Sequence, residues 1–384
     1  YKYSESLMVE SVFSKKPLVN SSKISSNSLN QQRSLLLFYS GIKSETTKKH
    51  YSYYLDEFRQ HFIIKNHDKL LEIKPKKLQE MVEDFVIYEK SRHKSASYIA
   101  GKICALNLFF SMNDVILNWN KLQKMLPEKT KPSGDKAYST EQIQILLKNT
   151  TNLEYRALIH FMAASGVRVG SFEEMKIKHL KDMSNGCKSV KVYADSIQEY
   201  FTFIHQEAIE SLNEYLESRK RKGEIITNDS WIFCSPYDNS NPLPTRTITS
   251  AMGRYVKKSL GREKAKAGRY EIMSSHGMRK RFDTVLKSNR MVNISLAEKL
   301  MGHSKTIPLD NSYFKPVIEQ LFDEYQKAIP QLIIDDKYRL EEKLKQKDNQ
   351  INELESKDQE IDMLKMTILE IKNNMLELQN KIKS

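Results

Sequence analysis

The sequence predicts a mainly α-helical protein with a small β-hairpin or sheet (an α+β class), built from two globular units and a C-terminal coiled coil. Three observations predict this class. Apolar residues recur at intervals of three and four over most of the chain, residues 189–204 alternate apolar and polar side chains around a polar turn, and residues 361–382 keep the spacing of a coiled-coil seam. A chain of 384 residues is also too long for one compact domain.

Residues 1–30 are predicted to form a flexible tail, because they are rich in Ser, Asn and Lys and show no sustained period. Residues 31–127 predict a compact helical domain. One helix over residues 44–62 begins with a capping Ser or Thr, a second starts at Pro75, and a third covers about 95–112. Their apolar faces are Tyr51, Tyr54, Leu55, Phe58 and Phe62; Leu78, Met81, Val82, Phe85 and Val86; and Ile99, Ile103, Leu106 and Phe110.

A linker is predicted over residues 128–137, which mix Pro, Gly and Lys without apolar periodicity. The second unit, residues 138–333, opens with Ser139 as a cap before a helix through Ile143, Leu146 and Leu147. Within this unit the segment SVKVYADSIQEYFTFI (189–204) predicts a β-hairpin, and the remainder is expected to be mostly helical.

A coiled coil is predicted over residues 334–384. Its main seam alternates intervals of three and four through Ile361, Leu364, Ile368, Ile371, Met375, Leu378 and Ile382. Upstream, Leu340, Leu344, Ile351 and Leu354 keep a similar spacing, but Lys347 and Asp358 interrupt it, so the two stretches can differ in register. We interpret the seam as a site of self-association. A long helix packed on its own domain is the alternative.

The charge of the chain favours a polyanionic partner. Lys and Arg number 62 against 48 Asp and Glu, which gives a formal net charge of +14 and a pI near 9.3. Residues 335–384 are slightly acidic, so the basic charge lies on the globular units. Nucleic acid is the first expectation, and an anionic membrane surface is the second. Lys48, Lys49, Lys94 and Lys102, at or near predicted helix starts, are candidate phosphate contacts, although a solvated lysine face explains each one alone.

Other classes are disfavoured by what the sequence lacks. There is no run of about 18 apolar residues, and the N-terminus lacks the charged-then-apolar order of a secretory signal, so we expect an intracellular, cytoplasmic and nucleoid-associated protein without membrane contact. Cys104, Cys187 and Cys234 are odd in number and far apart. Neither a disulfide framework nor a structural zinc site is therefore expected.

Four short segments of the second unit contain residue types suited to attack on a phosphodiester: SGVRVGSFEEM with Arg168, SSHGMRKRF with His276 and Arg279, LMGHS with His303, and LDNSYFKP with Tyr313. Each residue has an ordinary structural explanation when taken alone, such as an ion pair, a helix cap or core packing. In this order, and in a basic protein of two domains, the set favours chemistry on a phosphodiester. Guanidinium groups suit such chemistry because each stays charged and can donate two parallel hydrogen bonds to phosphate oxygens.

On these motifs the chain resembles the tyrosine recombinases of the phage-integrase type, and the segments LMGHS and SYFKP are most similar to archaeal viral or mobile-element members. The resemblance spans about 31–333 and implies a core-binding domain that binds DNA, followed by a catalytic domain. It implies a site-specific recombinase that cleaves and rejoins double-stranded DNA at attachment sites, assembles as a tetramer on that DNA, and needs neither metal nor nucleotide cofactor.

The resemblance also implies a role for each residue. Arg168 and Arg279 would bind the phosphate oxygens, His276 would accept the tyrosine proton, and His303 would donate a hydrogen bond to a non-bridging oxygen. Tyr313 would be the nucleophile and form a covalent 3′-phosphotyrosine.

Two departures from the family pattern concern the general acid and the support of Arg168. The family has a lysine in the hairpin turn that protonates the departing 5′-oxygen, whereas the turn here runs from Asp195 to Glu199. Lys191, or less favourably Lys188, is the candidate for this role. Ser171 stands where an acidic residue is common, so that Glu173, Glu174 or no acidic residue at all orients Arg168.

Two alternative functions remain open at this point. A type IB topoisomerase shares the Arg, His and Tyr chemistry but relaxes supercoils as a monomer. A DNA-binding architectural protein of the same fold would have lost catalysis, and the absent turn lysine favours that alternative.

Overall fold

The computed structural model describes residues 33–128, 136–261, 270–303 and 316–383. The predicted tail lies outside these ranges. The chain divides into two compact units, residues 1–131 and 132–384, and each is described here by itself.

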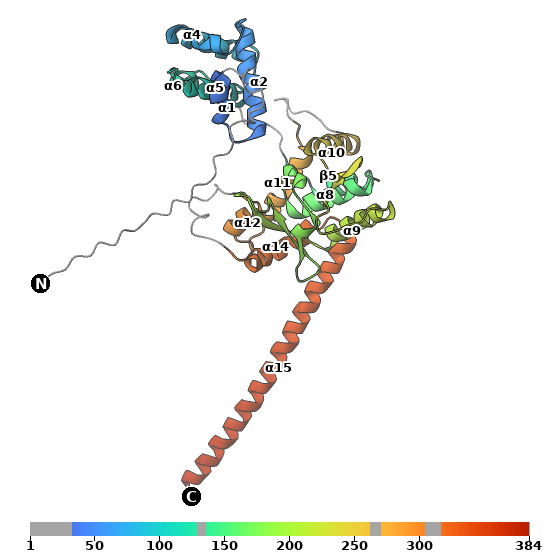
Figure 1. Cartoon of the computed structure of the whole chain (residues 1–384). Coiled ribbons are helices and arrows are strands. Elements are labelled where there is room, and N and C mark those ends of the chain that lie inside the picture. The colour runs from blue at the N-terminus through green and yellow to red at the C-terminus, as the bar shows by residue number, and fades with distance from the viewer. Residues whose placement is uncertain (1–32, 129–135, 262–269, 304–315, 384) are drawn as a thin grey trace, which may run out of the picture. The chain divides into compact units, whose positions relative to one another are not determined.

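The first unit is entirely helical within its described residues (Figure 1). Its helices are α1 (Arg33–Ser40), α2 (Glu45–His61), α3 (Asp68–Leu71), α4 (Pro75–Ser91), α5 (Ala96–Met112) and α6 (Trp119–Lys124). Ser44 and Ser95 cap α2 and α5 through their hydroxyl oxygens, and Pro75 opens α4. The core is rich in phenylalanine, and the rings of Phe58, Phe85 and Phe110 pack edge to face.

Lys102 corrects one expectation from the sequence. This residue lies in the middle of α5, its side chain is 1% exposed, and its ammonium pairs with Glu57 at 2.8 Å and Glu89 at 3.0 Å. The ammonium also lies over the rings of Phe85 and Tyr98. Lys102 is therefore a buried ion-pair residue of the helical core and not a phosphate contact, because moving it to DNA would break its ion pair with the buried carboxylate of Glu89.

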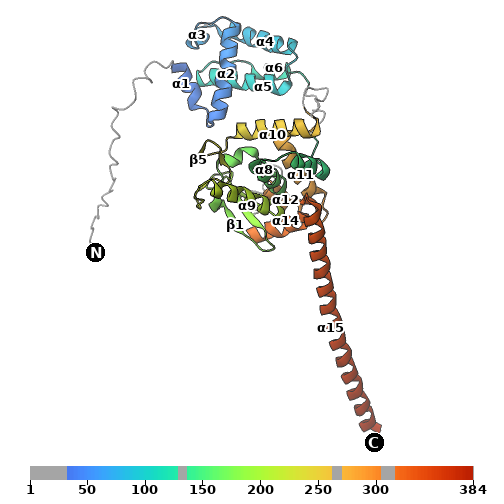
Figure 2. The ribbon, with the colours of Figure 1, turned by 90° about the vertical axis from the view of Figure 1, so that its right-hand side faces the viewer.

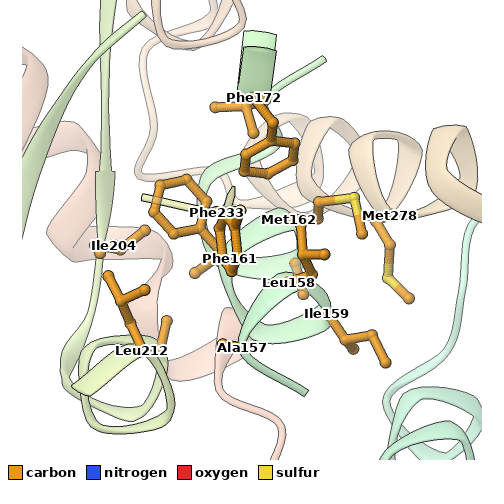
Figure 3. Close-up of a cluster of buried hydrophobic side chains, with 14 of the residues drawn as sticks. Ala157, Leu158, Ile159, Phe161, Met162, Phe172, Ile204, Leu212, Phe233 and Met278 are labelled. Carbon is orange, nitrogen blue, oxygen red and sulfur yellow. The ribbon is translucent and has the colours of Figure 1, made fainter. Parts of the chain in front are cut away.

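The second unit surrounds the almost fully buried helix α8 (Leu153–Ser165). Figure 3 shows side chains of α8, including Leu158, Phe161 and Met162, among residues from later segments such as Phe172 and Phe233. The rings of Phe161, Phe172 and Phe233 lie within 5.3–5.9 Å of one another, edge to face. This packing fixes the position at which α8 ends, and the candidate site begins there.

Helices and short strands complete the second unit (Figures 1 and 2). The elements before the predicted hairpin are α7 (Thr140–Lys148), the 3-10 turns η1 (Val169–Glu173) and η2 (Ile177–His179), and β1 (Leu180–Asp182). After the hairpin follow α9 (Gln206–Arg221), β4 (Cys234–Ser235), β5 (Asp238–Pro242), α10 (Thr245–Leu260), α11 (Ser274–Ser288), α12 (Ile294–Leu300), α14 (Ile318–Leu332) and α15 (Asp336–Lys383).

The predicted hairpin is confirmed. Strands β2 (Lys188–Val192) and β3 (Tyr200–Ile204) pair antiparallel, and β1 extends them to the sheet order β1-β2-β3. The small antiparallel pair β4–β5 was not predicted, because the sequence DNSNP of β5 has no apolar alternation and its residues are mostly exposed. The mainly helical class with small antiparallel sheets is therefore correct. No helix among the described residues is long and apolar enough to cross a membrane.

Two buried histidines and a buried glutamate of the second unit lie close to the start of α15. Burial lowers the pKa of His160 to about 4 and the pKa of His205 to about 3, and it raises the pKa of Glu207 to about 7. Glu207 also accepts hydrogen bonds from the backbone N–H groups of Ile334 and Asp335, at 2.9 and 2.8 Å. The side chain of Glu207 thereby fixes the start of α15.

These shifts predict acid destabilisation to which His160 and His205 each contribute. The lowered histidine pKa values stabilise the fold above pH 6.5 and lose that effect as the pH falls, whereas the raised pKa of Glu207 acts in the opposite direction. Between pH 6.5 and 4.5 these three groups bind about one more proton in the unfolded chain, so together they lower the free energy of unfolding by about 1.4 kcal/mol per pH unit. His205→Gln should reduce the slope measured in urea unfolding by about this amount. An unchanged slope would contradict the assignment.

Candidate active site

A cavity of about 160 Å³ brings together three of the predicted catalytic residues. It is lined by Val167, Arg168, Val169, Ser275, His276 and Arg279. Arg168 comes from the segment after α8, and the other two lie on α11, with His276 one helical turn before Arg279. His276 is exposed at this cavity, while Arg279 is 5% exposed. Residues more than 100 positions apart in the chain thus share one basic pocket.

Arg168 is positioned by the end of α8. Gly166 terminates the helix with φ +61°, and a Cβ atom there would lie 2.2 Å from Cδ1 of Phe282, so this position requires glycine. The chain then turns into an extended conformation at Arg168, whose carbonyl accepts a hydrogen bond from the Ser171 hydroxyl at 2.6 Å. Nη2 of Arg168 donates to the carbonyl of Gly302 at 3.2 Å.

Arg279 lines the pocket and links the segment after α8 to the segment that precedes His303. Its Nη1 donates to the carbonyl of Gly166 at 2.6 Å, and its Nη2 donates to the carbonyl of Met301; both hydrogen bonds are buried. Burial lowers the pKa of Arg279, and the nearby positive charge of Arg168 lowers it further. The two guanidinium groups line one pocket, and their like charges repel each other. A phosphate anion bound between them would therefore be stabilised.

His303 follows directly after the segment that both arginines bind. Its Nδ1 lies 2.7 Å from Oε2 of Glu298, and its backbone N–H donates to the Glu298 carbonyl at 3.0 Å. Because a carboxylate accepts, Nδ1 carries the proton and Nε2 lies on the opposite side of the ring. Glu298 is buried and pairs with Lys287 at 2.5 Å. Glu298 was not predicted from the sequence. The available signal was its position five residues before His303, a candidate catalytic histidine.

Two tyrosines of the hairpin face the arginines. Tyr200, at the start of β3, is 8% exposed and its ring covers Gly302. Tyr193 follows β2 with φ +52°, and the two ring centroids are 6.3 Å apart. Burial raises the pKa of both phenols, while Arg168 and Arg279 act against that rise. The sequence analysis did not select either tyrosine.

Lys191, Lys188 and Glu173 each have a partner outside the pocket. The Lys191 ammonium lies 3.0 Å from Glu199 and 3.3 Å from Asp195, and the hydrogen bond with Glu199 is the main cause that raises its pKa. Lys188 pairs with Asp182. Glu173 accepts the backbone N–H of Thr245 and fixes the start of α10. Glu173 is therefore engaged with α10, and Arg168 donates its hydrogen bond to the Gly302 carbonyl.

The remaining predicted residues fall into two groups. Tyr313 lies outside the described residues. Lys48 is half-buried, lies over the ring of Tyr39 and is 3.8 Å from Glu45, while Lys94 lies over the ring of Tyr98. Lys49 is exposed on α2. These three lysines remain candidates for phosphate contacts.

A further set of exposed cations was missed on α10, which packs against α11 and η1 through Ile248, Ala251, Met252 and Val256. Its exposed basic residues are Arg246, Arg254, Lys257 and Lys258. The helical spacing of these cations opposite an apolar face was the signal available in the sequence.

Comparison with known proteins gives consistent results. Residues 137–316 match the phage integrase family. The tyrosine recombinase XerC of Leptospira interrogans serogroup Icterohaemorrhagiae serovar copenhageni (strain Fiocruz L1-130) is 25% identical over 324 residues, which cover 80% of this chain and 96% of the relative.

Two solved structures of the Tn1549 transposon integrase share the fold. The complex with transposon right end DNA is 17% identical with a TM-score of 0.54, and the match covers 77% of this chain and 98% of that chain. The complex with circular intermediate DNA is also 17% identical, with a TM-score of 0.52 and coverage of 77% and 99%. The family match spans the segments that contribute Arg168, His276, Arg279 and His303. Residues 137–316 therefore form a phage integrase domain, and this part of the chain belongs to the tyrosine recombinases, the enzymes that cleave and rejoin DNA.

Proposed function

We propose that this protein is a site-specific integrase of a mobile element, and that its active site consists of Arg168, His276, Arg279, His303 and Tyr313. The observation that carries the proposal is the pocket shared by Arg168, His276 and Arg279, with the segment before His303 tied to both arginines. A protein that had lost catalysis would have no reason to keep this arrangement.

The proposed reaction begins with a phosphodiester in the pocket. Arg168 and Arg279 neutralise its non-bridging oxygens, and Nε2 of His303 contacts one of them. His276 takes the proton of the Tyr313 hydroxyl as the phenol oxygen attacks phosphorus. The bond from phosphorus to the 5′-oxygen breaks, the 5′-oxygen takes up a proton, and a 3′-phosphotyrosine remains. A 5′-hydroxyl of another strand reverses these steps and rejoins the DNA.

Lys191 is the proposed donor of the proton to the 5′-oxygen, and its partners define a test. Its ammonium must leave Glu199 and Asp195 to reach the DNA. Lys191→Ala should slow cleavage of a normal substrate by about 10²-fold or more, yet cleave a substrate with sulfur in place of the 5′-oxygen at the wild-type rate, because a thiolate leaves without a proton. If Lys191→Ala cleaves both substrates like the wild type while Tyr193→Phe shows this pattern, the phenol of Tyr193 is the acid instead.

DNA binding and assembly complete the proposal. The similar transposon integrase was solved in complex with DNA, and the exposed cations of α2 and α10 suit a phosphate backbone. We propose that the helical unit and the catalytic unit both bind the duplex, and that four protomers assemble on two attachment sites.

The test is covalent capture on a library of nicked duplexes with randomised sequence. The wild-type protein should form an SDS-stable adduct in EDTA and enrich a specific sequence, and Tyr313→Phe should bind the same DNA without forming the adduct. Adduct formation without any sequence enrichment, together with relaxation of supercoiled plasmid by a monomer, would favour a type IB topoisomerase. DNA binding without adduct by either protein would favour an architectural protein.

A further inference from the structure

Helix α15 presents a row of exposed apolar side chains. Their exposed fractions run from 47% at Ile361 to 64% at Ile368. The row comprises Leu340, Leu344, Ile351, Leu354, Ile361, Leu364, Ile368, Ile371 and Met375. Figures 1 and 2 draw α15 as one unbroken helix, and its sequence contains neither Pro nor Gly. A stripe of this length exposed to water requires a partner surface.

The base of α15 is fixed to the catalytic unit. Besides the two hydrogen bonds to Glu207, the hydroxyl of Tyr338 donates to Glu210 on α9, and Gln144 of α7 donates to the carbonyl of Ile334 at 2.8 Å. The start of α15 is thus held in place by two elements, α7 and α9. The alternative that the whole helix packs on its own domain is excluded for the apolar row, because its residues are exposed from Leu340 onward.

The row follows a coiled-coil seam with one discontinuity. Intervals alternate between four and three from Leu340 to Ile361, with Lys347 and Asp358 in two of the seam positions. Two intervals of three then meet at Ile361, and the alternation resumes from Leu364. This arrangement is a stammer, which overwinds the supercoil locally but leaves both halves on one continuous stripe.

We propose that α15 pairs with the α15 helix of a second copy of this chain in a parallel, two-stranded coiled coil. The charged residues beside the seam favour the parallel over the antiparallel direction. In a parallel pair each residue at the g position faces the e position five residues later in the partner helix. The charged pairs so formed are Lys343 with Asp348, Lys357 with Asp362, and Glu360 with Lys365. All three are of opposite sign, and no pair of g and e positions between Lys343 and Lys372 joins two like charges.

The seam itself also favours the parallel pair. There the two Lys347 side chains share one layer and the two Asp358 side chains share another, so two layers are polar and the other nine from Leu340 to Met375 are apolar. An antiparallel pair centred on Ile361 would instead place Lys347 against Met375 and Asp358 against Leu364. Because the two chains are identical, each of these contacts would occur twice. Four layers would then bury a charge against an apolar side chain, which is the more costly arrangement.

The pairing extends the proposed assembly on DNA. Only its functional role depends on that proposal; the pairing itself does not. Each coiled coil joins two catalytic units through the fixed base of α15, so the protein would reach DNA already paired, and two such pairs would form the tetramer. Because pairing requires no DNA and no catalysis, it can be measured separately from adduct formation.

Light scattering without DNA tests the partner. The full-length protein at micromolar concentration should have twice the mass of one 44.9 kDa chain. Ile368→Asp, in the seam, should reduce this to one chain, while Met366→Asp, two residues away and outside the seam, should leave two. A single-chain mass for the wild type, a mass of three or more chains, or an equal effect of both substitutions would overturn the proposal.

Cysteine cross-linking tests the direction. In a background with Cys104→Ser, which removes the exposed native thiol, Ile371→Cys should form a disulfide between two copies under mild oxidation. A mixture of Ile351→Cys and Ile371→Cys proteins should give no mixed disulfide, since those positions face each other only in the antiparallel pair. A mixed disulfide without the Ile371→Cys homodimer would overturn the parallel arrangement.

Discussion

Replacement of Arg279 by alanine is expected to slow formation of the covalent protein–DNA adduct by about 10²- to 10³-fold. The guanidinium binds the carbonyls of Gly166 and Met301 and lines the pocket beside Arg168. Its loss removes a charged donor from the phosphate and releases the segments on both sides of the pocket. Arg279→Lys should recover little of the rate, because an ammonium cannot bind both carbonyls and a phosphate in this geometry. Single-turnover cleavage of a nicked duplex measures both variants.

The same substitution has a cost in stability that must be separated from the chemistry. Two buried carbonyl oxygens lose their donor, which is worth about 1–3 kcal/mol for each of them. Urea unfolding should show this loss for Arg279→Ala. Arg221→Ala, which removes an exposed charge from the end of α9, should change neither stability nor rate. A wild-type cleavage rate in folded Arg279→Ala would contradict the role of this residue.

Substitution of Gly302 by alanine is expected to destabilise the second unit by about 2–4 kcal/mol and to abolish cleavage. Gly302 has φ +60°, and a Cβ atom there would lie 2.4 Å from Cδ1 of Tyr200. The Tyr200 ring is buried, so either it or the Gly302 segment must move. Because the Gly302 carbonyl holds Arg168 and the next residue is His303, this movement would displace two proposed catalytic groups.

The chain contains a matched control for this clash. Gly261 has the same φ of +60°, but a Cβ atom there would have no neighbour within 4 Å among the residues that the structure describes. Gly261→Ala should therefore cost only the left-handed conformation, about 1–2 kcal/mol, and leave cleavage intact. The double variant Gly302→Ala, Tyr200→Ala should recover part of the activity. Equal effects of the two glycine substitutions in urea unfolding and cleavage would contradict the account.

Much of the fold could be predicted because helix caps and apolar spacing are local signals. Ser44 and Ser139 cap the helices that they were expected to cap. Lys102 was misassigned because a lysine in a helix has the same local pattern whether it meets water or buried carboxylates, and its partners Glu57 and Glu89 lie on other helices. The β4–β5 pair had no signal, since β4 is only two residues long and β5 is polar and mostly exposed.

The candidate site could be predicted in its residue types but not in its supports. Arg168, His276 and Arg279 were selected by order and chemistry, and they line one pocket. The groups that hold them, chiefly the Gly302 carbonyl and the Glu298 carboxylate, act through tertiary contacts that no short motif records. A backbone carbonyl in particular has no residue type to recognise.

The most direct test of the central claim is the identity of the residue that becomes joined to DNA. The chain has 19 tyrosines, and Tyr193 and Tyr200 lie beside the two arginines, so loss of activity in one variant does not by itself name the nucleophile. The adduct trapped on a nicked duplex should be digested with nuclease and protease and its peptides analysed by mass spectrometry. The account predicts a nucleotide on the peptide that contains Tyr313. A nucleotide on Tyr193, or on any other residue, would contradict it.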